Sequence, residues 1–120
     1  MSNSYQKGAK DTRPWGTWEV VEVGDSFCVK KICVTPHNIL SLQSHDFRSE
    51  HWIIVKGTAV VTLGEEKILK NTGEHVYIPV KTKHRIQNDS EQMLEFIEVQ
   101  CGEKLDENDI IRYEDVYGRV

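Results

Sequence analysis

The sequence predicts an all-β domain with the strand pattern of a sandwich or barrel, and three observations lead to this prediction. Short stretches rich in β-branched and aromatic residues recur along the chain. Gly, Pro, Asn and Asp separate these stretches at intervals typical of turns. No window of helical length has apolar residues at a 3.6-residue period, apart from a weak turn over residues 106–111. Helix is therefore expected to be a minor component.

The 120 residues are enough for one domain with one core, which we expect over residues 13–120. Residues 1–12 are mostly polar and are expected to form a flexible leader. The following segments are the predicted strands, in chain order: 17–23, 27–35, 50–55, 58–63, 67–69, 75–78, 84–87 and 93–99. The segment over residues 106–120 is expected to pack on the outside of the domain.

Charge and cysteine content narrow the class of protein. The net charge of -4 and the pI near 5.7 argue against a nucleic-acid-binding protein, which would concentrate Lys and Arg. No apolar run at the N-terminus indicates a signal peptide or a membrane span. The three cysteines form no Cys-x-x-Cys pair and are expected to be free thiols. The cytoplasm is the expected location.

Two segments carry potential metal ligands at related spacings. The first has Gln43, His45 and Glu50, and the second has His84. Side chains on a strand alternate faces, so Gln43 and His45 are expected to point to the same side. An alternative register with His45 first and Phe47 second is disfavoured, because phenylalanine has no lone pair. The four donors suit a divalent cation, with zinc as first choice and manganese, iron, cobalt or nickel as alternatives.

The spacing of these ligands and of their neighbouring glycines and proline resembles the signature of the cupin fold. The flanking motif residues are Gly57, Gly73, Pro79 and Asn88. Cupins are jelly rolls, also called double-stranded β-helices, in which the strand bearing His84 would fold back against the strand bearing Gln43. The resemblance therefore implies one metal site inside a rolled β-sheet.

A more specific resemblance covers nearly everything after residue 12. Residues 40–52 resemble the signature of type II phosphomannose isomerases, a domain related to the C-terminal part of bifunctional enzymes that also carry a mannose-1-phosphate guanylyltransferase. The motifs at residues 13–16, 77–79, 97–100 and 109–119 extend the match. The resemblance implies metal-dependent interconversion of mannose 6-phosphate and fructose 6-phosphate, as part of polysaccharide biosynthesis. No Gly-rich phosphate loop indicates a guanylyltransferase in this chain.

The same resemblance implies roles for individual residues. Arg48 lies between two of the ligands and is the candidate catalytic residue, able to stabilise an enediolate or bind phosphate. Trp52 is a candidate for lining the sugar pocket. The candidates for binding the phosphate are Lys30, Arg85 and Arg112, with Arg13 as a further one. The sequence does not identify the general base.

Two departures from the family pattern leave other functions open. Asp46 and Phe47 stand where relatives have histidines, so the inward-pointing position 47 is expected to add an apolar side chain to the pocket. Lys81 stands where cupins generally have glycine. An isomerase or epimerase of another phosphorylated or nucleotide-linked sugar is one alternative. A non-catalytic sugar-binding cupin is another, and an iron-dependent dioxygenase is a third. We expect a phosphorylated sugar as ligand, no nucleic-acid or membrane partner, and a homodimer that covers exposed sheet edges.

Overall fold

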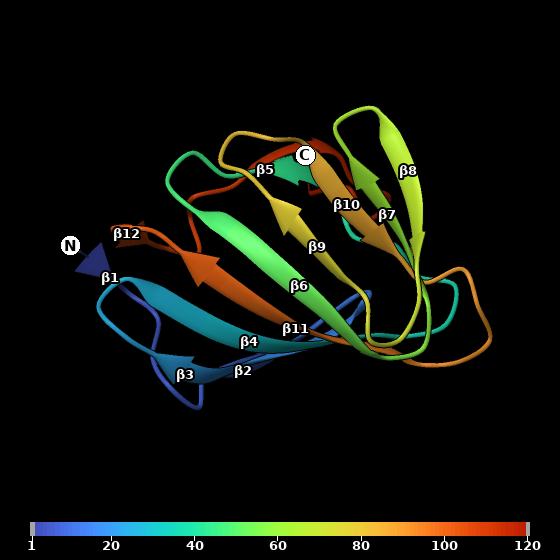
Figure 1. The fold of residues 1–120 in the computed structure, drawn as a ribbon, viewed down its shortest axis with the longest axis horizontal. Coiled ribbons are helices and arrows are strands. Elements are labelled where there is room, and N and C mark those ends of the chain that lie inside the picture. The colour runs from blue at the N-terminus through green and yellow to red at the C-terminus, as the bar shows by residue number, and fades with distance from the viewer. Residues whose placement is uncertain (1, 120) are drawn as a thin grey trace.

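Two β-sheets face each other in the computed structural model, which describes residues 2–119 (Figure 1). The six-stranded sheet contains, in spatial order, β2 (Lys10–Arg13), β3 (Gly16–Val23), β4 (Phe27–Val34), β11 (Leu94–Cys101), β6 (Ser49–Lys56) and β9 (His75–Ile78). The five-stranded sheet contains β13 (Ile111–Glu114), β5 (Leu42–Ser44), β10 (His84–Gln87), β7 (Ala59–Leu63) and β8 (Glu66–Lys70). A third, two-stranded sheet joins β1 (Ser2–Asn3) to β12 (Lys104–Leu105).

The prediction of an all-β jelly roll is confirmed, and each of the eight predicted strands has a counterpart within about two residues at either end. β10 pairs antiparallel with β5, with His84 opposite Gln43, as the fold-back required. Within residues 2–119 no helix is present, and the predicted weak turn contains two backbone hydrogen bonds. The N–H of Asp109 donates to the Asp106 carbonyl oxygen at 3.1 Å, and that of Ile110 donates to the Asn108 carbonyl oxygen at 2.9 Å. Consequently no helix in that range is long and apolar enough to cross a membrane.

Strand alternation divides the interior into an apolar end and a polar end. On β11, Leu94 and Phe96 are buried at one end of the strand, and Glu98 and Gln100 occupy the same face at the other end. Ile32 on β4 is buried in the apolar half. The apolar half forms the main core, whose buried members are Trp15, Ile32, Val34, Leu40, Trp52, Ile54, Ala59, Val61, Val76, Ile78, Ile86, Leu94 and Phe96. The polar half is the part of the interior where a site can form.

Two turn positions show why the motif residues matter. Gly57 has a φ of 83°, and a Cβ there would lie 2.7 Å from the Met93 carbonyl oxygen, so only glycine fits. Lys81, the departure from the family glycine, has a φ of 61° and keeps the same kind of left-handed backbone. Its N–H donates to the His45 carbonyl oxygen at 2.7 Å. The turn is therefore retained at the cost of some backbone strain.

The N-terminal segment differs from the flexible leader that we expected. Residues 2–3 and 10–13 form strands β1 and β2, and Tyr5 is buried against the domain. In Figure 1, β1 and β12 lie side by side at one edge of the molecule. The C-terminal segment is also more integrated than expected, because β13 pairs with β5 and extends the five-stranded sheet.

Candidate functional site

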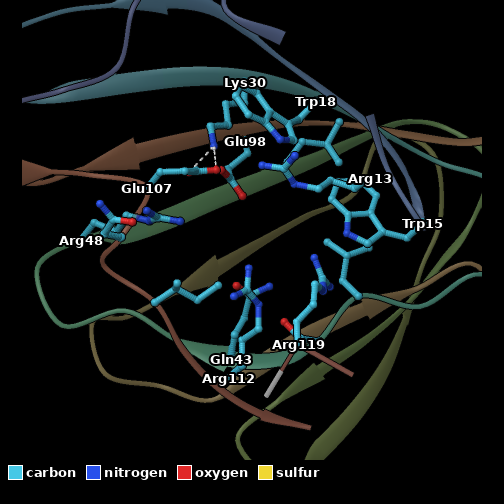
Figure 2. Close-up of a pocket in the computed structure, with 15 residues that line it drawn as sticks. Arg13, Trp15, Trp18, Lys30, Gln43, Arg48, Glu98, Glu107, Arg112 and Arg119 are labelled. Carbon is cyan, nitrogen blue, oxygen red and sulfur yellow. Dashed lines mark hydrogen bonds and ion pairs between the residues drawn. The ribbon is translucent and has the colours of Figure 1, made fainter. Parts of the chain in front are cut away.

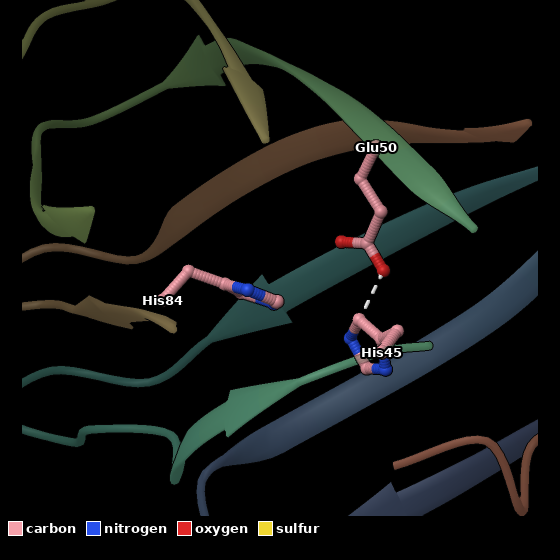
Figure 3. Close-up of side chains that lie close together, drawn as sticks. All are labelled: His45, Glu50 and His84. Atoms are coloured by element: carbon pink, nitrogen blue, oxygen red, sulfur yellow. Dashed lines mark ion pairs between the residues drawn. The ribbon is translucent and has the colours of Figure 1, made fainter. Parts of the chain in front are cut away.

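Three of the four predicted metal ligands converge between the two sheets (Figure 3). His45 follows β5, His84 begins β10, and Glu50 lies on β6 of the opposite sheet. Their ligand atoms all lie within 4.8 Å of one another, and all three side chains are buried. His45 Nε2 is 3.2 Å from Glu50 Oε2, and the two imidazole centroids are 5.0 Å apart.

Backbone carbonyls orient both imidazole rings. Nδ1 of His45 lies 2.7 Å from the Asp109 carbonyl oxygen, and Nδ1 of His84 lies 2.9 Å from that of Thr82. A carbonyl only accepts hydrogen bonds, so each Nδ1 carries the hydrogen and the lone pair of each ring lies on Nε2. Burial lowers the pKa of His45 to about 4 and also lowers that of His84, so both rings are neutral at pH 7. Neutral imidazoles are the form that binds a metal ion.

Glu50 supplies the negative charge of the cluster. Burial acts to raise the pKa of this carboxyl group, but the Arg48 guanidinium and the neighbouring histidines outweigh it, and the pKa lies below its ordinary value. Trp52 Nε1 donates to one carboxylate oxygen at 2.9 Å, and Arg48 Nε donates to the other at 2.8 Å. Two neutral imidazoles and one carboxylate therefore fit a divalent cation of the zinc class.

Gln43, the fourth predicted ligand, lies on β5 directly opposite His84. Residues opposite each other on antiparallel strands project from the same face, so both side chains point inward. Gln43 also lines the cavity next to the cluster, where it pairs in register with Arg112 of β13 (Figure 2). Its direct ligation of an ion stays a prediction. Ser44 projects from the opposite face of β5, and its hydroxyl oxygen lies 2.9 Å from that of Tyr113, at hydrogen-bond distance.

A cavity of about 280 Å³ adjoins the cluster (Figure 2). This volume is near the lower end of the roughly 300–1,000 Å³ that is usual for small-molecule sites. Two tryptophans, Trp15 and Trp18, and two carboxyl groups, Glu98 and Glu107, line it. Five cationic side chains also line it: Arg13, Lys30, Arg48, Arg112 and Arg119. The surplus of positive charge suits an anionic ligand.

Arg48 connects the metal-ligand cluster to the cavity. It is only 7% exposed, and besides its bond to Glu50 it donates from Nη1 to the Tyr5 hydroxyl at 3.1 Å. Nη2 lies 3.3 Å from Nε2 of His45. The predicted catalytic residue therefore touches two candidate ligands and also lines the cavity.

The other predicted binding residues divide into two groups. Lys30 and Arg112 line the cavity, and Nε of Arg112 is buried without a hydrogen-bond partner among the described residues. Arg85 and Trp52 do not line it. Arg85 projects from the face of β10 opposite to His84 and donates to the Leu40 carbonyl oxygen at 3.0 Å. Trp52 lies in the core, 3% exposed, where it holds Glu50.

Sequence reasoning did not assign Glu98, although β11 carried a signal for it. Glu98 falls on the same face as Leu94 and Phe96, so a carboxyl group occupies a core position. Burial and the nearby Glu50 carboxylate raise its pKa to about 8, and Gln100 Nε2 donates to it at 2.8 Å. Strand parity in the sequence was enough to find this buried polar pair.

Arg119, Glu107 and Tyr5 were also missed. They come from the two ends of the chain, outside the two ligand motifs, and no local pattern marks them as cavity residues. Phe47 shows the opposite case. We expected it to point into the pocket, but it is 50% exposed, does not line the cavity and lies under Lys104, whose Nζ is 4.5 Å from the ring centroid.

Comparison with known proteins shows the family to which the chain belongs and agrees with the fold. Residues 2–115 match the family described as mannose-6-phosphate isomerase C-terminal. The xanthan biosynthesis protein XanB of Xanthomonas campestris is 50% identical over 108 residues, covering 90% of this chain and 23% of that protein. The mannose-1-phosphate guanylyltransferase ManC of Salmonella typhimurium is 44% identical over 108 residues, covering 90% and 22%. The chain thus spans less than a quarter of the length of these relatives.

Solved structures at low sequence identity share the fold. A double-stranded β-helix protein of Klebsiella pneumoniae has a TM-score of 0.71 at 15% identity, covering 81% of this chain and 78% of that one. The cupin domain of Schizosaccharomyces pombe Cnp3 has a TM-score of 0.69 at 10% identity, covering 72% and 64%. The homodimer, the phosphorylated-sugar ligand, the lack of nucleic-acid and membrane partners and the cytoplasmic location stay predictions. The chain has the cupin fold and belongs to the mannose-6-phosphate isomerase C-terminal family.

Proposed function

We propose that this domain is a metal-dependent aldose–ketose isomerase that interconverts mannose 6-phosphate and fructose 6-phosphate. One observation carries the proposal: Arg48 joins a buried His-Glu-His donor set to a cavity lined by five cationic side chains. The donor set suits a divalent cation, and the cavity suits a sugar that bears a dianionic group. Membership of the mannose-6-phosphate isomerase C-terminal family supports this choice of reaction.

The cationic side chains that line the cavity can bind the phosphate group. Arg112 and Arg119 enter from the C-terminal segment, and Arg13 enters from the N-terminal side. Arginine binds phosphate with two parallel hydrogen bonds, and Arg112 has a buried Nε–H without a partner among residues 2–119. Trp15 and Trp18 supply apolar surface on which the carbon skeleton of a sugar can pack. We therefore assign the phosphate to these arginines.

The isomerisation moves one proton between C2 and C1 and a second proton between the O2 and O1 oxygens, through an enediolate. A divalent cation held by His45, Glu50 and His84 would polarise the substrate carbonyl as a Lewis acid. Arg48, which is always cationic and is buried beside these ligands, stabilises the negative charge that develops on the substrate oxygens. Glu98 lines the cavity, and its carboxyl group lies near that of Glu50, so we assign proton transfer to it.

Purified protein loaded separately with zinc, manganese, iron, cobalt or nickel should interconvert the two hexose phosphates. His45→Ala and Glu50→Ala should lose bound metal and turnover together. Glu98→Gln should keep the metal and lower kcat by about 100- to 10,000-fold, the usual contribution of a general acid or base. Lys67→Ala, on the exposed strand β8, is the control and should change neither.

The alternative functions predict different results in the same assays. A wild type that binds mannose 6-phosphate without turnover with every metal would reject the isomerase and favour a sugar-binding protein. Turnover of another phosphorylated or nucleotide-linked sugar would change the substrate and leave the metal site intact. The placement of Phe47 outside the cavity removes the main sequence argument for that second substrate.

A further inference from the structure

We infer that Tyr5, in the N-terminal segment, is a positioning residue for the cavity: its hydroxyl group holds Arg48 and Glu107 in place for an anionic ligand. The chemical identity of that ligand, a sugar phosphate, rests on the proposed function. The positioning itself rests only on the contacts of the hydroxyl group. The segment that looked like a flexible leader would then be part of the binding site.

Pairing of the N-terminus with the opposite end of the chain brings Tyr5 to this position. β1 pairs parallel with β12, and the N–H of Ser4 donates to the Leu105 carbonyl oxygen at 2.9 Å. The Asn3 side chain accepts from the N–H of Tyr5 at 3.0 Å and fixes the backbone at this point. The Tyr5 ring packs in a small second core with Val20, Cys28 and Leu105, and the residue is 9% exposed.

The Tyr5 hydroxyl group bridges one anionic and one cationic wall residue. It donates to Oε2 of Glu107 at 2.7 Å, because a carboxylate can only accept. Its oxygen accepts from Nη1 of Arg48 at 3.1 Å. Lys30 completes the group: its Nζ lies 3.1 and 3.2 Å from the two Glu107 carboxylate oxygens and 4.5 Å from the centroid of the Tyr5 ring.

These contacts determine how the cations face a ligand. Without the hydroxyl group, Nη1 of Arg48 would keep only the Asp106 carbonyl oxygen, at 3.4 Å. Glu107 would then rely on Lys30 alone among these neighbours, and it would compete with an incoming anion for that ammonium group. Tyr5 therefore shares the Glu107 carboxylate with Lys30, which weakens the hold of Glu107 on that ammonium group, and it restrains Arg48. Both effects favour binding of an anion in the cavity.

The direct test is phosphate binding by the metal-loaded protein. Trp15 and Trp18 line the cavity, so their fluorescence should report a titration with inorganic phosphate. Tyr5→Phe removes only the hydroxyl group and should raise the Kd for phosphate about threefold to tenfold. Tyr117→Phe is the matched control, because it removes a hydroxyl that donates to the Asn38 side chain at 2.9 Å away from the cavity lining. Its Kd should equal that of the wild type.

A double-mutant cycle separates positioning from a merely structural role. If Tyr5 acts through Arg48, then Tyr5→Phe should have a clearly smaller effect on the Kd in the Arg48→Lys background. Equal phosphate affinity of Tyr5→Phe and wild type, or a lowered unfolding midpoint with unchanged affinity, would overturn the inference. So would a wild type that binds no phosphate. A wild type that binds phosphate but does not isomerise hexose phosphates would reject only the proposed function.

Discussion

Asp109 offers a prediction in which stability and metal binding change together. Its carboxylate accepts from the backbone N–H groups of Asp46 at 2.8 Å and Phe47 at 3.0 Å, and its carbonyl oxygen orients His45. Asp109→Asn keeps the size but leaves one oxygen to accept, so one of the two N–H groups must turn to water. Asp46 and Phe47 are both exposed, so water replaces part of the lost hydrogen bond. The free energy of unfolding is therefore expected to fall by about 1–2 kcal/mol.

Two measurements check this magnitude. For a chain of this length, about 1–2 kcal/mol corresponds to a fall in Tm of roughly 4–10 °C. A loosened Asp109 carbonyl no longer fixes the imidazole of His45, so zinc affinity measured by chelator competition should fall about 10-fold. Asp89→Asn is the control, because this side chain is exposed and makes no hydrogen bond within residues 2–119. An Asp109→Asn variant with wild-type Tm and zinc affinity would refute the reasoning.

Three further predictions concern a turn, the thiols and pH. Lys81→Gly should stabilise the fold by about 0.5–1 kcal/mol in urea unfolding, because glycine adopts the φ of 61° without strain; an unchanged or lower midpoint would contradict this. Burial raises the pKa of Cys28 to about 11, so a thiol reagent at neutral pH should modify the exposed Cys101 and spare Cys28, as mass spectrometry of peptides would show. Burial acts to raise the pKa of Glu107. The charge of Lys30 and the hydrogen bonds from Tyr5 and Lys30 outweigh burial, so the pKa of Glu107 lies below its ordinary value of 4.5. Its stabilisation is therefore complete near neutral pH and is lost as the pH falls below about 4.5, so the stability advantage over Glu107→Gln should shrink there; an advantage that persists at lower pH would be inconsistent with this assignment.

Local patterns predicted the strands and most of the metal-ligand cluster. The alternation of β-branched and aromatic residues between turns was sufficient for β4 (Phe27–Val34) and β10 (His84–Gln87), because a strand with one buried face must repeat every second residue. The spacing of His45, Glu50 and His84 identified three side chains that meet in the structure. Short strands such as β1 and β12 could not be predicted, because two paired residues leave no period to detect.

The sequence by itself thus determined an all-β fold and three side chains that meet in the donor cluster, because both depend on residue type and spacing along the chain. Only the tertiary structure decided that Tyr5 and Arg119, from opposite ends of the chain, line or support one cavity, and that Arg85 faces away from it. It also decided that Trp52 holds Glu50 from within the core. Contacts between residues so distant in sequence depend on strand order and register across two sheets, and no local period encodes that arrangement.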